Sequence, residues 1–202
     1  MLPNGLVVGF DLDMTLIDSR PAIHASLVAM SAELGVPVDA DLAITRLGPP
    51  LETDLLQWFP ADEVAAAADC FRKYYFEQCL TGTLPLPGAY DSINAVKAAG
   101  GKVIAVTAKS ERGTVLCLGA LDMSFDAVIA DVHGDGKRDA LKEHNATIYV
   151  GDTIADIRAG VEAGAQAVGV STGMHTGQEL EAAGATIVFP SLAQFPSWME
   201  RR

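Results

Sequence analysis

Residues 6–19 read LVVGFDLDMTLIDS, and the change of character inside this stretch guides the interpretation of the whole chain. An apolar run typical of a buried strand leads directly into Asp11 and Asp13. A buried carboxylate costs several kcal/mol unless it is paired or bound to a metal ion. Two carboxylates at the end of a core strand therefore need a cation or a metal ion close by.

The composition indicates one folded core with a smaller insert. The chain has 202 residues, of which half are hydrophobic and 20% are charged, so it can bury a sizeable core. The net charge of −12 repels nucleic-acid phosphates and anionic membrane surfaces, and we expect neither as a partner. An anionic substrate would need its own cations or a metal ion at the site.

The cysteines and the first residues bear on the compartment. The three cysteines are odd in number and form no CxxC pair, which favours a reducing environment. The apolar run at residues 6–10 lacks a basic flank and is too short for a signal segment or a membrane span. We therefore expect a cytoplasmic protein, and the sequence leaves a monomer or a homodimer open.

The remainder of the chain alternates apolar β-rich runs with amphipathic helical patterns. This alternation predicts an α/β fold with a doubly wound, Rossmann-like parallel sheet. Runs such as VIAV at 103–106 and AVIA at 127–130 indicate strands buried on both faces. Gly100, Gly119, Gly164 and Gly184 follow predicted helices as C-caps. The expected strands are 6–11, 102–107, 125–130, 147–151, 167–170 and 186–189; the expected helices are 89–99, 112–118, 138–144, 154–163 and 177–183.

One segment breaks this alternation. Residues 20–82 contain no convincing strand and lead back through the Gly/Pro-rich connector TGTLPLPG at 81–88. We predict an all-helical cap domain at 20–82, inserted over the carboxyl end of the first strand, and a core made of residues 1–19 and 83–202. The helices expected in the cap are 21–34, 39–46, 51–58 and 62–80.

Polar residues follow several of the predicted strands. In a doubly wound sheet, ligands bind outside the carboxyl ends of the strands, so these side chains are expected to meet. Four separate segments thus deliver acids, a hydroxyl group and a lysine to one edge: Asp11 and Asp13, then Thr107, then Lys137, then Asp152 with Asp156.

With these motifs in place, the chain resembles the haloacid dehalogenase superfamily, in its phosphoglycolate-phosphatase-like branch with a helical cap. The resemblance rests on DLDMTLIDS (11–19), VTAKS (106–110), Lys137 and VGDTIADIRAG (150–160), with RLGPPLE (46–52) and LPLPGAYDSI (84–93) in support. It implies a Mg²⁺-dependent phosphatase that acts on a small phosphorylated metabolite, with phosphoglycolate as the leading candidate.

The resemblance also implies a role for each carboxylate. Asp11 would attack phosphorus and form an aspartyl-phosphate, which divides a difficult hydrolysis into two easier steps. Asp13 would be the general acid for the leaving group and then the base for water. Mg²⁺ would be held by Asp11, the Asp13 backbone carbonyl and Asp152, because it prefers hard oxygen ligands. Asp156 would be either an outer metal residue or the partner that orients Lys137.

The remaining roles concern the phosphoryl group and the substrate. Thr107 and Lys137 would bind the transferring phosphoryl oxygens, with Lys142 as the next candidate if Lys137 is misassigned. Arg46 in the cap is a candidate for substrate recognition, because a guanidinium group can bind a carboxylate or phosphate with two hydrogen bonds. Met14 and Ala108 depart from the family pattern, which usually has Gly and Asn at these places.

Three other interpretations share part of this pattern. A phosphosugar mutase of the same superfamily would use the same aspartates but return the phosphoryl group to its substrate. A haloacid dehalogenase would use Asp11 without a metal, and the presence of Asp13 and Asp152 argues against it. A phospho-acceptor signalling module of the receiver type is shorter and has no insert such as residues 20–82.

Overall fold

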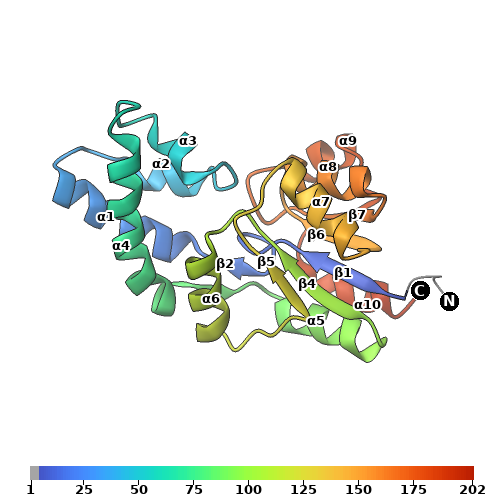
Figure 1. The fold of residues 1–202 in the computed structure, drawn as a ribbon. Coiled ribbons are helices and arrows are strands. Elements are labelled where there is room, and N and C mark those ends of the chain that lie inside the picture. Colours follow the sequence, from blue (N-terminus) through green and yellow to red (C-terminus); the bar gives the residue numbers. More distant parts are fainter. Residues whose placement is uncertain (1–4) are drawn as a thin grey trace.

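The computed structural model describes residues 5–202, so residues 1–4 of the predicted core lie outside the described part. Its centre is a six-stranded parallel sheet in the order β5-β4-β1-β6-β7-β8 (Figure 1). This confirms the predicted doubly wound α/β fold. The strands are β1 Val7–Phe10, β4 Lys102–Val106, β5 Ala127–Ile129, β6 Ile148–Gly151, β7 Gln166–Val170 and β8 Ile187–Phe189.

The first strand lies in the middle of the sheet, and this determines where the site forms. Phe10, the last residue of β1, lies beside Ala105 of β4 and Val150 of β6. The three strands therefore end at nearly the same level, and the residues that follow them emerge together. This edge is the position at which open α/β sheets bind ligands.

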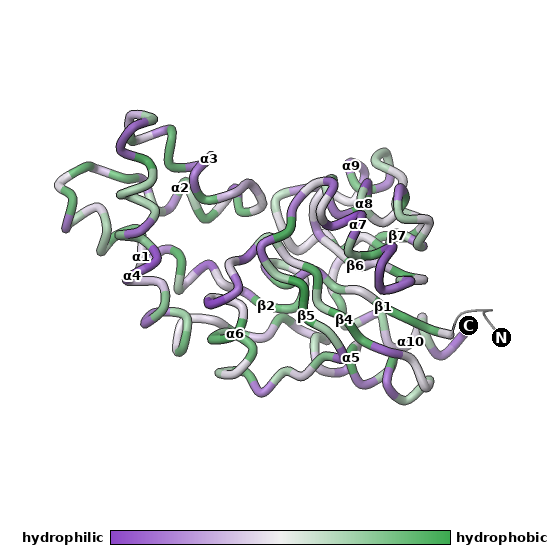
Figure 2. Tube along the Cα trace, in the orientation of Figure 1, coloured by the Kyte–Doolittle hydropathy of each residue, from purple (hydrophilic) through white to green (hydrophobic). Residues whose placement is uncertain are grey.

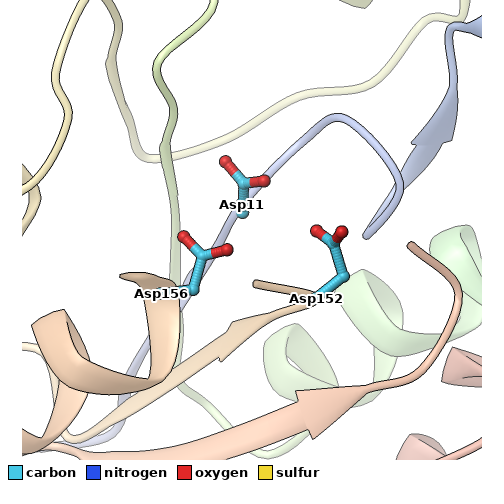
Figure 3. A group of neighbouring side chains, drawn as sticks. All are labelled: Asp11, Asp152 and Asp156. Atoms are coloured by element: carbon cyan, nitrogen blue, oxygen red, sulfur yellow. The ribbon is translucent and has the colours of Figure 1, made fainter. Parts of the chain in front are cut away.

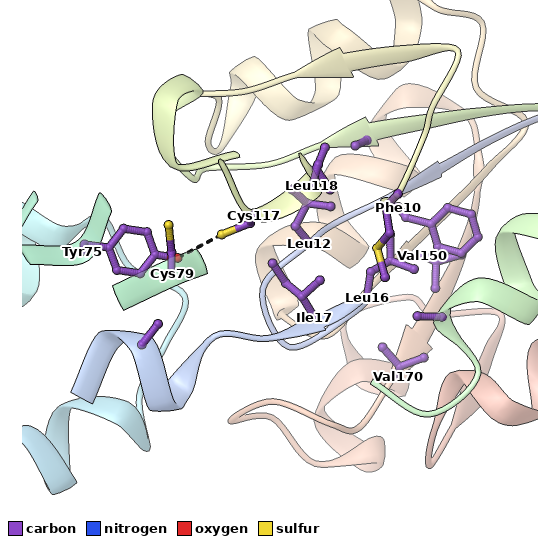
Figure 4. Close-up of a cluster of buried hydrophobic side chains, with 14 of the residues drawn as sticks. Phe10, Leu12, Leu16, Ile17, Tyr75, Cys79, Cys117, Leu118, Val150 and Val170 are labelled. Carbon is purple, nitrogen blue, oxygen red and sulfur yellow. Dashed lines mark hydrogen bonds between the residues drawn. The ribbon is translucent and has the colours of Figure 1, made fainter. Parts of the chain in front are cut away.

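Helices cover both faces of the sheet, and alternate strand residues pack against each of them. Phe10 and Ala105 belong to one apolar cluster, shown in part in Figure 4, while Ile104 and Val106 belong to the cluster on the opposite face. The helices of the core are α5 Ala89–Ala98, α6 Glu111–Ala120, α7 Asp135–Glu143, α8 Ile154–Ala163, α9 Gly177–Ala182, the 3-10 helix η1 Leu192–Gln194 and α10 Phe195–Met199.

Residues 20–82 hold four helices and no strand, and this stretch is described throughout. Two short strands, β2 Ile17–Asp18 and β3 Leu84–Pro85, pair antiparallel where the chain leaves and re-enters the core. Figure 1 shows the four helices gathered to one side of the sheet. They are α1 Arg20–Leu34, α2 Ala40–Ile44, α3 Leu51–Leu55 and α4 Val64–Gly82.

Two details of the sequence analysis are wrong. The AVIA run does not form a strand buried on both faces, because β5 is an edge strand and Val128 is 44% exposed. Gly119 is not a helix cap, since α6 continues through it to Ala120, whereas Gly164 caps α8 in the left-handed conformation as expected. An apolar run alone does not reveal a strand's place in the sheet order.

Hydropathy follows the fold along the chain. Figure 2 shows hydrophobic colour along β1 and β5, whereas much of α7 is hydrophilic. Among the described residues, no helix combines the length and the apolar character needed to cross a membrane. The three cysteines, Cys70, Cys79 and Cys117, are buried and free.

Candidate active site

A cavity of about 440 Å³ lies at the carboxyl edge of the sheet, bounded on its other side by residues of α1, α3 and α4 and of the α2–α3 connection. All of the residues predicted from the sequence for the site line this cavity. They are Asp11, Asp13, Arg46, Thr107, Lys137, Asp152 and Asp156. Lys142, the alternative to Lys137, is exposed on the last turn of α7 and is not among the lining residues.

Three buried carboxylates converge in the floor of the cavity. Asp11, Asp152 and Asp156 each have an oxygen within 4.8 Å of the others (Figure 3). They come from the ends of β1 and β6 and from the first turn of α8. The fold thus brings together acids that lie about 140 residues apart in the chain, as the sequence predicted from the strand ends.

One buried lysine neutralises part of this charge. The Nζ atom of Lys137 lies 2.8 Å from Oδ1 of Asp11 and 2.7 Å from Oδ1 of Asp156. Burial alone would lower the pKa of Lys137, but the two carboxylates outweigh it and raise the pKa well above the ordinary value. Lys137 therefore stays charged at the place where an anionic group would enter.

The carboxylate of Asp156 is held by several hydrogen bonds from neighbouring residues. Besides Lys137, its carboxylate accepts hydrogen bonds from Tyr149 Oη at 3.1 Å and from the Thr153 hydroxyl at 2.5 Å. Thr153 and Asp156 form a reciprocal capping box at the start of α8. Burial raises the pKa of Asp156, but Lys137 and the Thr153 hydrogen bonds lower it further, so the net shift is downward. Of the two roles left open by the sequence, these contacts match the partner of Lys137.

The positive charge of Lys137 does not offset the cost of burying Asp11 and Asp152 as ionised carboxylates. Burial, with Asp156 nearby, raises the pKa of Asp11 to about 7 despite the opposing effect of Lys137. Burial and the two neighbouring carboxylates also raise the pKa of Asp152 well above its ordinary value. Hard carboxylate oxygens that repel one another in a buried pocket are a donor set suited to a small divalent cation. The residues present therefore fit a bound metal ion.

Two further residues determine the position of the Asp152 carboxylate, and neither was predicted from the sequence. The hydroxyl group of Thr15 donates to Asp152 Oδ1 at 2.9 Å. A Cβ atom at Gly173 would lie 1.8 Å from Asp152 Oδ2, so only glycine leaves room for this carboxylate. Thr15 could have been noticed inside the quoted motif, four residues after Asp11, whereas Gly173 has no local signal.

Asp13 lies beside a lysine that sequence reasoning also missed. Lys109 Nζ is 2.8 Å and 3.0 Å from the two carboxylate oxygens of Asp13. Lys109 stood in the quoted VTAKS motif, two residues after Thr107, and this position was its only signal. Thr107 itself is buried, and its side-chain oxygen accepts a hydrogen bond from the Lys109 backbone at 3.2 Å.

Arg46 reaches the cavity from the helical segment but is held by neighbours. Its guanidinium group donates to Gln57 at 2.6 Å and to Asp54 at 3.4 Å, and it lies 5.9 Å from the centroid of the Trp58 ring. Its Nε atom is buried and has no hydrogen-bond partner among the described residues. Within residues 5–202, one donor of Arg46 is thus left without an acceptor.

Met14, one of the two residues that depart from the family pattern, adopts an unusual backbone conformation. It has φ +62°, the left-handed conformation that glycine adopts most easily. Its side chain is buried and is not among the residues that line the cavity. The Thr172 hydroxyl group donates to the Met14 carbonyl and braces this turn.

Comparison with known proteins agrees with this geometry. A phosphoglycolate phosphatase from Aquifex aeolicus is 32% identical over 171 residues, which cover 76% of this chain and 78% of that protein. A haloacid dehalogenase-like hydrolase from Streptococcus pneumoniae superposes with a TM-score of 0.85 at 23% identity, over 98% of this chain and 99% of that one. A structure assigned as a beta-phosphoglucomutase from Thermotoga maritima gives 0.75 at 19% identity, over 97% and 99%.

The family itself follows from the length of the match. The family described as haloacid dehalogenase-like hydrolase matches residues 8–170, which include the acids of the site and the helical segment. Over most of its length, this chain therefore belongs to the haloacid dehalogenase-like hydrolase family and is an enzyme.

Proposed function

We propose that the protein is a Mg²⁺-dependent phosphatase that hydrolyses a small phosphomonoester through an aspartyl-phosphate on Asp11. The observation that carries this proposal is the buried group of Asp11, Asp152 and Lys137 at the end of β1. It offers a nucleophile, a place for a divalent cation and a fixed positive charge at one point. Membership of a hydrolase family removes the signalling-module interpretation.

The first step is attack by the Asp11 carboxylate on phosphorus. Lys137 and the Thr107 hydroxyl group bind phosphoryl oxygens, and Asp156 keeps the Lys137 ammonium pointed at Asp11. Asp13 gives a proton to the leaving alkoxide and later takes one from the water that hydrolyses the intermediate. Mg²⁺, held by Asp11, Asp152 and the Asp13 carbonyl, would supply positive charge that reduces repulsion between nucleophile and phosphate.

The helical segment 20–82 acts in this proposal as a cap that limits the substrate to small molecules. A cavity of about 440 Å³ has the size of sites that take metabolites. Phosphoglycolate is the leading substrate because of the Aquifex aeolicus relative and its 32% identity. Arg46, whose Nε has no partner in the described part of the chain, is the proposed contact for the substrate's second anionic group.

A phosphosugar mutase remains the second candidate, favoured by the similarity to the Thermotoga maritima structure. The two functions differ in the fate of the phosphoryl group. A phosphatase releases inorganic phosphate in proportion to the substrate consumed, whereas a mutase converts one sugar phosphate into its isomer and releases little.

The function is tested with a panel of phosphorylated metabolites, with release of inorganic phosphate as the readout. We expect Mg²⁺-dependent release from phosphoglycolate or a similarly small ester, and loss of at least about 10³-fold in kcat for Asp11→Asn, because the nucleophile is removed. EDTA should abolish activity and added Mg²⁺ should restore it. Full activity of Asp11→Asn, or isomerisation without phosphate release, would contradict the proposal.

A further inference from the structure

Lys109 has no role in the reaction as described so far, yet it is built into the site. Its side chain is only 6% exposed, and its ammonium group bonds to both carboxylate oxygens of Asp13 at 2.8 Å and 3.0 Å. Burial would lower the pKa of Lys109, but Asp13 outweighs it and raises the pKa above the ordinary value. The Lys109 ammonium group therefore holds both oxygens of the Asp13 carboxylate from one position.

The backbone of Lys109 is fixed from the sheet side. Its amide group donates to the Thr107 hydroxyl at 3.2 Å, and its carbonyl group accepts from the Asp131 amide at 3.0 Å. These bonds tie the loop after β4 to the loop after β5. The ammonium group thus extends from a braced anchor toward Asp13.

The helical segment covers the same lysine from the other side. The ring of Tyr75, from α4, lies 4.8 Å from the Lys109 ammonium in a cation–π arrangement. The Tyr75 hydroxyl group contacts the Cys117 thiol of α6 at 3.4 Å (Figure 4), and Phe71 stacks on the ring at 5.5 Å. Tyr75 is therefore held at the seam between α4 and α6, and it limits where Lys109 can go.

Asp13 itself has little else to orient it. Its side chain is 26% exposed, in contrast to the buried Asp11 and Asp152. Across residues 5–202, Lys109 donates both of the hydrogen bonds that its carboxylate receives from a side chain. A proton donor must be held within hydrogen-bond reach of the group it protonates, so this orientation matters for its chemistry.

We infer that Lys109 is a positioning residue, which fixes the Asp13 carboxylate for proton transfer and is itself held in place by Tyr75 of the helical segment. The inference rests on the proposed function of Asp13 as general acid. Two other roles compete with it: Lys109 could bind the substrate directly, or it could serve only to stabilise the fold.

Substrates with different leaving groups distinguish these roles. p-Nitrophenolate departs without protonation, whereas an alkoxide needs the general acid, so impaired positioning of Asp13 lowers kcat/KM selectively for alkyl phosphates. We expect Lys109→Met to reduce kcat/KM for an alkyl phosphate about tenfold or more beyond its effect on p-nitrophenyl phosphate. Lys142→Met, on the exposed side of α7, is the matched control and should change neither value.

Companion variants keep the test informative if Lys109→Met does not fold. Lys109→Arg keeps the charge and should recover part of the alkyl phosphate activity. Tyr75→Leu removes the ring above Lys109 and should show the same selectivity to a smaller degree, whereas Tyr75→Phe keeps the ring and should not. Equal losses on both substrates for Lys109→Met and Tyr75→Leu would overturn the inference in favour of a structural role.

A double-mutant cycle with Asp13→Asn excludes direct substrate binding. If Lys109 acts through Asp13, the variant carrying both substitutions should be no slower than Asp13→Asn alone. A full additional loss in the double variant would mean that Lys109 touches the substrate, and the inference would be wrong. If Asp13→Asn itself shows no leaving-group selectivity, Asp13 is not the general acid, and the proposed function is wrong at this point. If Asp13→Asn shows the selectivity and Lys109→Met does not, only the positioning role of Lys109 is wrong.

Discussion

Asp11 occupies a position that destabilises the folded protein when no cation is bound. Its pKa rises from the ordinary 3.8 to about 7, chiefly because it is buried. Between these two values the folded protein keeps a proton that the unfolded chain has lost. The contribution of Asp11 to stability therefore falls as pH rises from about 4 to about 7, since this group binds more protons in the folded state over this range.

This pH dependence predicts how Asp11→Asn changes the stability of the protein in EDTA. The variant removes a carboxylate that must ionise in a crowded pocket, so its melting temperature should exceed that of the natural protein at pH 8. The difference should shrink toward pH 4, where Asp11 is protonated anyway. Differential scanning calorimetry at the two pH values measures this. A variant that is less stable at pH 8, or a difference independent of pH, would contradict the charge crowding derived for this site.

Gly173 provides a test of Asp152 that leaves the acids themselves unchanged. Because an added Cβ would lie 1.8 Å from Asp152 Oδ2, Gly173→Ala must displace that carboxylate. We expect the Mg²⁺ concentration for half-maximal activity to rise about tenfold or more, as for other disturbed metal ligands. Gly177→Ala is the control, because its Cβ would meet only Val188 at an ordinary 3.6 Å. An unchanged Mg²⁺ requirement in Gly173→Ala would show that Asp152 does not bind the metal ion.

At the scale of elements, the helix α5 is locked to the C-terminal segment at its first turn. Gly88, its N-cap, has φ +88°, and a Cβ there would lie 2.3 Å from the Ala193 backbone nitrogen. Gly88→Ala should therefore lower the free energy of unfolding by at least ~2 kcal/mol, from left-handed strain and the backbone clash together. Urea denaturation measures the change.

The control for this prediction is a helical glycine in open space. Gly119 lies inside α6, and an added Cβ would meet nothing within 4 Å. Gly119→Ala should leave stability unchanged or raise it by up to about 1 kcal/mol, because alanine favours a helix. If both alanine variants behave alike, the contact between α5 and η1 is not as close as described.

The elements that sequence patterns revealed are those with several turns or several alternating residues. The predicted helix at 154–163 agrees with α8, for which the sequence signal was Gly164 after its last residue; the capping box of Thr153 and Asp156 at its start is seen in the structure. The strands β2 and β3 have two residues each and carry no periodic pattern. The edge position of β5 is a property of strand order, which depends on contacts that no local window contains.

At the scale of the whole molecule, the site was predictable to the extent that strand ends share one edge. The acids of the site and Lys137 line the same cavity because a parallel sheet delivers them there. The residues that complete the site could not be found this way. Thr15 contacts Asp152 across 137 positions and Lys109 contacts Asp13 across 96, so only the folded chain relates them.

In the proposed mechanism Asp11 accepts the phosphoryl group during turnover, and trapping the covalent intermediate detects this step. The enzyme is mixed with substrate and Mg²⁺, quenched in acid, and reduced with borohydride, which converts an aspartyl-phosphate into homoserine. Peptide mass spectrometry then locates the change. We predict homoserine at position 11, absent when substrate is omitted. Homoserine at another aspartate, or continued turnover with none formed, would contradict the account.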